Sequence, residues 1–84
     1  MTETRDELKN AVGQTIKNIR IKKGLSQDVL SGLSDLDRSH LTKIESGKKL
    51  PNLETIWKIA NAVEIDPSNL ISLVERQISS KDMI

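Results

Sequence analysis

The 84-residue chain contains no cysteine. It can therefore form neither a disulfide framework nor a thiolate metal site, which suits a reducing cytoplasm. No stretch approaches the ~20 consecutive apolar residues that a membrane span requires, and the first residues lack the apolar segment of a secretory signal. We expect a cytoplasmic protein that has no contact with a membrane.

Aromatic residues are almost absent, since Phe and Tyr are missing and Trp57 stands alone. A surface that stacks single-stranded nucleic acid normally uses several exposed aromatics. Trp57 falls within an apolar helical stripe, so we expect it in the core. His40 is the only histidine and has no cysteine to assist it, so no zinc site and no cofactor are expected; packing or a phosphate contact suits it better.

The constellations typical of enzymes are missing as well. There is no glycine-rich phosphate loop, no pair of carboxylates in an apolar setting, and no set of nucleophile, histidine and acid. We expect a binding protein and not an enzyme.

The length allows one domain, and 36% of the residues are hydrophobic. A core of this size rarely supplies more than ~3–5 kcal/mol, so association of two copies is a natural additional source of stability.

The net charge of +1 conceals an uneven distribution. Residues 9–49 hold nine Lys or Arg against four acidic residues, a local charge of +5, whereas each flank carries −2. A local concentration of cations favours a polyanionic partner, although such clusters also occur on ordinary solvated helices.

Apolar residues recur at helical spacing almost throughout, and no segment alternates like a half-buried strand. Thr4 with Glu7 resembles a capping box, and Ser26, Asp37 and Asn52 are good caps for the next three helices. A compact all-α, five-helix domain over residues 5–78 is predicted, followed by a frayed tail over 79–84. The expected helices cover 5–23, 27–33, 38 to 45 or 46, 53 to about 63, and 67–78.

The second and third of these helices are short and separated by a tight turn, which is the geometry of a DNA-binding helix-turn-helix. On the third, Leu41 and Ile44 lie on one side, and an arc of about 140° opposite them contains no acid. Long cations and hydroxyls of this kind bind base edges and phosphates. The arc consists of Arg38, Ser39, Thr42, Lys43 and Ser46.

Four segments carry a resemblance to a known family: GLSQD at 24–28, LDRS at 36–39, KIESG at 43–47 and PNLETI at 51–56. Together they resemble the phage-repressor-type (Xre-like) helix-turn-helix transcriptional regulators, whose fold is lambda-repressor-like. The resemblance covers about residues 12–66. The overall length of the chain also resembles that of restriction–modification controller proteins, as does the Asp66-Pro67 pair that starts the fifth helix. Phage and plasmid repressors fit nearly as well.

The sequence departs from the family pattern at three positions. Ser31 replaces a small alanine, Gly32 weakens the second helix, and Asp35 replaces the glycine of the turn. Aspartate tolerates a left-handed backbone better than most residues, so the turn remains accessible at some cost.

The resemblance also implies roles for individual residues. Gln27 would contact a phosphate and brace Arg38, the main candidate for reading a guanine. Arg20 and Glu45 would form a buried ion pair that supports the scaffold. Lys22 and Lys23 are weaker candidates for DNA contact. The expected DNA-binding residues are Gln27, Arg38, Ser39, Thr42, Lys43, Lys48, Lys49 and Asn52.

The fifth helix carries an apolar arc of roughly 160°, wider than a terminal helix needs for so small a core. We expect part of it to form a homodimer that binds a palindromic DNA site; the alternative is that the whole arc closes the monomer core. The arc consists of Leu70, Ile71, Leu73, Val74 and Ile78.

The expected partners are double-stranded DNA, a second copy of the chain and, as a further candidate, RNA polymerase. The main alternative function is the antitoxin of a toxin–antitoxin pair, which uses the same fold to bind a toxin and DNA. The short tail over 79–84 disfavours that alternative.

Overall fold

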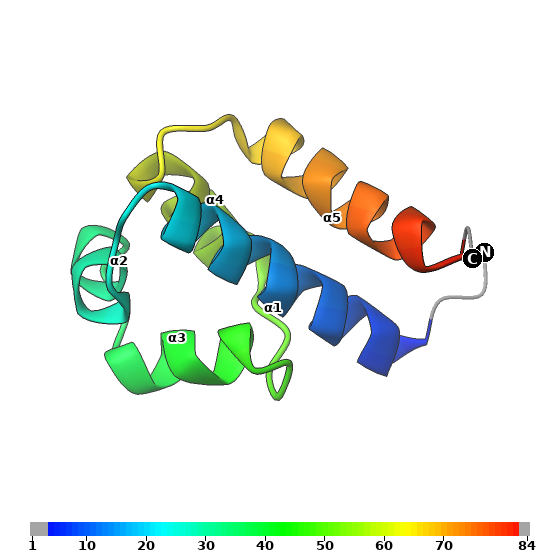
Figure 1. The fold of residues 1–84 in the computed structure, drawn as a ribbon. Coiled ribbons are helices and arrows are strands. Elements are labelled where there is room, and N and C mark those ends of the chain that lie inside the picture. The colour runs from blue at the N-terminus through cyan, green and yellow to red at the C-terminus, as the bar shows by residue number, and fades with distance from the viewer. Residues whose placement is uncertain (1–3, 83–84) are drawn as a thin grey trace.

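The computed structural model describes residues 4–82, and the side chains of residues 4–80. All regular structure in this range is helical, as predicted (Figure 1). No helix in the described range is long and apolar enough to cross a membrane. The helices are α1 (Arg5–Lys22), α2 (Gln27–Leu33), α3 (Arg38–Glu45), α4 (Leu53–Ala62) and α5 (Pro67–Asp82).

The helix starts agree with the predicted caps. Thr4 and Glu7 form the reciprocal capping box of α1, with Glu7 N donating to Thr4 Oγ1 over 3.0 Å. Ser26 and Asn52 accept bonds from the backbone amides three residues ahead. Asp37 occupies the N-cap position of α3, but its side chain makes no capping bond.

The turn between α2 and α3 includes a residue with left-handed backbone geometry. Asp35 has φ of 55°, as expected where it replaces a glycine. The amide of Leu36 donates to the carbonyl of Ser31 over 2.9 Å, which closes the end of α2. Ser31 is buried, and its hydroxyl donates to the carbonyl of Asp28. The departures at positions 31 and 35 are therefore compatible with a closed helix-turn-helix.

The core lies between all five helices, with α1 in the middle. In Figure 1, α3 and α5 lie on opposite sides of α1, and both make extensive contact with it. Ile16, Leu41 and Leu70 come from these three helices and are almost completely buried. The two ends of the described chain lie at the same end of the molecule.

Trp57, predicted to lie in the core, is 52% exposed instead. Two other apolar residues at helical spacing are also exposed, since Val29 is 48% exposed and Leu53 at the start of α4 reaches 66%. On α4 the buried positions are Thr55, Ile56, Ile59, Ala60 and Val63. Trp57 lies more than about 100° from the centre of that set, so it points away from the core of the described residues.

The fifth helix differs from its prediction in two respects. It continues through Asp82, four residues beyond the predicted end at Ile78, because no glycine or proline interrupts it and it lies along α1 (Figure 1). Met83 and Ile84, the last residues of the predicted tail, lie outside the described range. The second difference is that the middle of the predicted apolar arc is buried in the core of the chain itself.

Leu70 and Val74 are 0% and 4% exposed, because the middle of the arc packs on the core. Their prediction as dimer-interface residues is therefore wrong. Ile78 is partly buried against the same core. Only Ile71 and Leu73, at the two edges of the arc, remain exposed.

A glycine sets the distance between α1 and α3. A Cβ atom on Gly13 would overlap the backbone carbonyl oxygen of Ile44 and lie 2.9 Å from that of Glu45. Backbone atoms cannot move aside as a side chain can. The two helices can therefore approach this closely only with glycine at position 13.

We expect Gly13→Ala to lower the free energy of unfolding by about 1–3 kcal/mol, because α3 must shift to admit the methyl group. Gly32→Ala is the matched control, since a Cβ there meets nothing within 4 Å. The control should raise stability by up to about 1 kcal/mol through helix propensity. Urea denaturation of both variants checks this; a stabilised Gly13→Ala would contradict the close approach.

Candidate nucleic-acid interface

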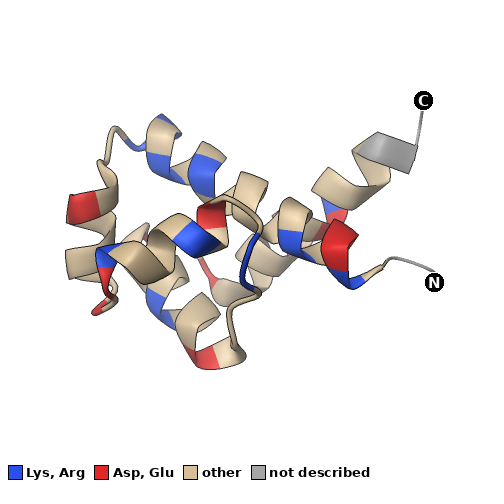
Figure 2. Ribbon diagram, turned by 90° about the horizontal axis from the view of Figure 1, so that it is seen from below, with Lys and Arg blue, Asp and Glu red and all other residues tan. Residues whose placement is uncertain are grey.

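The outward face of α3 carries half of the predicted DNA-binding residues, namely Arg38, Ser39, Thr42 and Lys43. Leu41 and Ile44 are fully buried beneath it and fix the helix to the core. Seen from below, α3 lies across the front of the molecule, with Lys and Arg along it and in the loop that follows (Figure 2). A shallow depression of about 510 Å³ is lined by Arg38, Ser39, Thr42, Lys43 and Lys48.

No carboxylate lines this depression. Its guanidinium and ammonium groups are donors with positive charge, and its hydroxyls both donate and accept. This set suits phosphate oxygens and the acceptor-rich edge of guanine.

Gln27 connects the start of α2 to this face. Its amide oxygen accepts a hydrogen bond from Thr42 Oγ1 over 2.9 Å, and its amide nitrogen donates to Glu45 Oε1 over 3.1 Å. Gln27 therefore braces Thr42 and not Arg38, contrary to the sequence-based expectation. Both polar atoms of its amide are used, so its rotamer is fixed.

Arg38 makes a different contact. Its guanidinium lies 3.4 Å from Asp28 Oδ1, and both side chains are largely exposed, at 63% and 70%. Exposed pairs of this kind contribute about 0–1 kcal/mol. Arg38 can therefore leave Asp28 at little cost and turn to a stronger acceptor.

The predicted ion pair of Arg20 and Glu45 is present and supports α3 from behind. Arg20 Nε and Nη2 donate to the two carboxylate oxygens of Glu45 at 2.7 and 3.0 Å, and Arg20 Nη1 donates to the carbonyl of Leu25. The side chains are only 13% and 3% exposed. The hydrogen bonds to Glu45 and its negative charge raise the pKa of Arg20 above its ordinary value, against the opposing effect of burial, so the guanidinium stays charged.

The pair is part of a chain of bonds that runs from α1 to the surface of α3. Arg20 holds Glu45, Glu45 accepts from Gln27, and Gln27 accepts from the exposed Thr42. The position of one surface hydroxyl is thereby set by a charge-assisted contact in the interior.

The remaining candidates lie around this face or away from it. Lys49 and Asn52 are exposed but do not line the depression, and the Asn52 side chain caps α4 by accepting from Thr55 N over 2.8 Å. Lys22 lines a different cavity, between α1 and α5. His40 is half-buried, and its Nε2 has no hydrogen-bond partner among the described residues.

Sequence reasoning missed two residues that shape the site. A glycine inside an apolar helical pattern, such as Gly13, is a signal of close packing because it costs ~1 kcal/mol relative to alanine. Asp28 gave no such signal, since its link to Arg38 depends on how α2 and α3 are placed in space.

Glu45→Gln should destabilise the protein by about 3 kcal/mol, because Arg20 keeps its buried charge and loses its counterion. Asp28→Asn is the matched control for the exposed pair and should cost less than about 1 kcal/mol. The free energies of unfolding of the two variants, from urea titrations, test this. Similar small losses in both would mean that the interior pair has no special role.

Comparison with known proteins assigns the fold to a family. The helix-turn-helix family HTH_3 matches residues 16–70. The control protein C.MunI of Mycoplasma sp is 33% identical over 73 residues, which cover 86% of this chain and 99% of that protein.

Two solved structures are similar over most of the chain. The restriction-modification controller protein C.AhdI from Aeromonas hydrophila has a TM-score of 0.71 at 40% identity, covering 74% of this chain and 94% of that chain. The controller protein C.Esp1396I, solved as a tetramer with its natural 35 base-pair operator, has a TM-score of 0.78 at 27% identity, covering 84% and 93%. The chain therefore belongs to the HTH_3 helix-turn-helix family of transcriptional regulators.

Proposed function

We propose that the protein is a sequence-specific regulator that binds double-stranded DNA as a homodimer on a palindromic operator. The observation that carries the proposal is the exposed, acid-free set of donors on α3, which stands on two fully buried anchors. An α-helix of this kind fits the major groove, where each base pair presents a distinct pattern of donors and acceptors.

Each residue has a proposed role that follows from its chemistry. Arg38 reads guanine through a bidentate pair of bonds to O6 and N7, and Ser39, Thr42 and Lys43 contact neighbouring bases or phosphates. Gln27, at the start of α2, contacts a phosphate through the second hydrogen of its amide nitrogen, since only one is needed for the bond to Glu45. Lys48 and Lys49, with the backbone amides around Asn52, hold the phosphate backbone on the other side.

Family membership favours regulation over catalysis, and the similar controller protein bound to its operator supports DNA as the partner. The control-protein relatives also favour a role beside restriction–modification genes. Such a regulator acts in the cytoplasm. A bound operator next to a promoter would bring RNA polymerase within reach of it.

Selection from a random duplex library should recover a palindromic sequence. The logarithm of the binding constant should fall linearly with the logarithm of the salt concentration, with a slope of about −0.9 for each neutralised phosphate. Arg38→Ala should relax preference by about 1–3 kcal/mol at one base pair per half-site, because it removes a bidentate base contact. Lys48→Ala should weaken all duplexes about equally.

Binding profiles of the parent and both variants on the same library measure these effects. Equal losses by Arg38→Ala on every sequence would contradict its assignment as the reader. Failure of any duplex to bind the parent would overturn the proposed function.

The proposed dimer surface combines α4 with one edge of α5. Leu53 and Trp57 lie one turn apart on α4, and Ile71 lies on α5, which packs against α4. All three are at least 48% exposed, and large apolar side chains that gather on one surface are typical of a protein interface. Leu73 lies about 160° from Ile71 around α5 and lines the cavity beside α1, so we assign it no part in the dimer.

A two-fold dimer would place two copies of α3 about 34–36 Å apart, matching successive major grooves on one side of the duplex. Trp57→Glu and Ile71→Glu should each raise the dimer dissociation constant at least about tenfold, because a carboxylate would be buried without a partner. Leu33→Glu is the control, since Leu33 is equally exposed but lies on α2.

Sedimentation of these proteins at micromolar concentration gives the masses. A monomeric parent would overturn the dimer. A dimer unchanged by both Trp57→Glu and Ile71→Glu would show that another surface forms it.

A further inference from the structure

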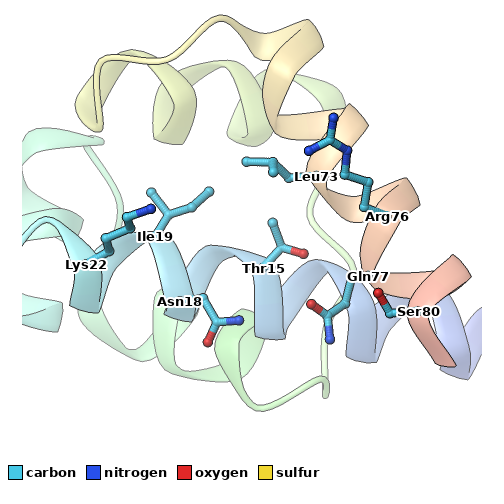
Figure 3. A pocket seen from close by; sticks show the side chains of 8 residues that line it. All are labelled: Thr15, Asn18, Ile19, Lys22, Leu73, Arg76, Gln77 and Ser80. Carbon is cyan, nitrogen blue, oxygen red and sulfur yellow. The ribbon is translucent and has the colours of Figure 1, made fainter.

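A cavity of about 280 Å³ lies between α1 and α5, on the side of α1 that faces away from α3 (Figures 1 and 3). Ile19 and Leu73 supply apolar surface from the two helices. Lys22 and Arg76 supply positive charge, and none of the lining residues carries a carboxylate. The cavity therefore has an uncompensated positive charge beside an apolar wall.

Neither cation is held by a counterion, since no described side chain forms an ion pair with Lys22 or Arg76. Both side chains are exposed at the rim. They can turn toward an anion without breaking an existing contact, which removes one of the usual costs of binding.

The interior of the cavity contains an unused polar group. Thr15 is 4% exposed, and its Oγ1 has no hydrogen-bond partner among the described residues. Figure 3 shows Thr15 rising from α1 in the middle of the cavity, between Asn18 and Gln77. Buried hydroxyls are normally bonded, so an unpartnered one in a cavity points to a ligand atom that would bond it.

We propose that this cavity binds a small organic anion with an apolar body. The anionic group lies between Lys22 and Arg76, the apolar body packs on Ile19 and Leu73, and the Thr15 hydroxyl bonds a polar atom of the ligand. Pockets for small molecules commonly combine an apolar wall with a few convergent polar groups. The site is independent of the proposed DNA surface, because α1 separates it from α3.

The probes are four six-carbon compounds with different polar groups: hexanoate, hexyl phosphate, hexan-1-ol and hexylamine. Titration into the labelled full chain, followed by amide chemical shifts, gives the dissociation constants and the location. The two anions should bind with constants on the order of 1 mM, as expected for ligands of this size. The shifts should centre on Thr15 and Gln77.

The alcohol and the amine should bind at least about tenfold more weakly, because they lack the charge-assisted bonds. Equal binding of all four compounds would overturn the proposal, since it would show only an apolar groove. Failure of both anions to shift these amides would overturn it as well. A preference between the two anions would identify a carboxylate or a phosphate ligand.

Variants test the assigned contacts. Arg76→Gln and Lys22→Gln should each weaken hexanoate about tenfold and leave hexan-1-ol unchanged, whereas the control Lys17→Gln, on the same helix but outside the cavity, should leave both unchanged. Thr15→Val removes the hydroxyl at constant shape. It should weaken the anions severalfold without lowering the melting temperature, because no bond within the protein is lost.

Unaltered hexanoate binding in all three cavity variants would overturn the assignment. DNA binding by these variants is measured separately. If a variant lost DNA binding but still bound the anion, the result would count against the proposed regulatory function and not against the proposed cavity site.

Discussion

The carboxylate of Glu45 lies where α1, α2 and α3 meet, and it belongs to α3 while its partners belong to the other two helices. Arg20 donates to both of its oxygens and Gln27 donates to one of them. A charge that is 97% buried is costly in any arrangement that lacks these donors. The pair adds little net stability by itself, but it penalises every other placement of α3. The orientation of the proposed reading face therefore depends on this contact.

Much of the fold could be predicted because its signals are local. Thr4 with Glu7, Ser26 and Asn52 mark helix starts through bonds to amides three residues away, and such bonds need no tertiary context. The left-handed conformation of Asp35, with φ of 55°, could be predicted through the family resemblance, because Asp35 replaces the glycine of the turn. The ion pair of Arg20 and Glu45 spans 25 positions and could be predicted only through the family resemblance.

The errors concern what lies opposite a helix face. A helical wheel shows that Trp57 shares a stripe with buried residues, and that Leu70 and Val74 share one with Ile71, but it does not show which element covers each part. In the structure, α1 covers the middle of the α5 arc, whereas the described residues leave Trp57 52% exposed. Likewise, Gln27 pairs with Thr42 because of the way α2 and α3 are placed relative to each other. The spacing of residues along the sequence does not reveal that placement.

The two sides of α1 differ in how much movement they permit. Toward α3 the backbones touch at Gly13, and a buried ion pair joins the helices, so a shift of even a methyl group's width meets resistance. Toward α5 the contact leaves a cavity of about 280 Å³ and a buried hydroxyl without a partner. Densely packed contacts transmit displacement, whereas a cavity can absorb it. If a second copy of the chain or a bound ligand displaced α5, we would therefore expect the cavity side to take up the displacement and α1 and α3 to keep their relative position.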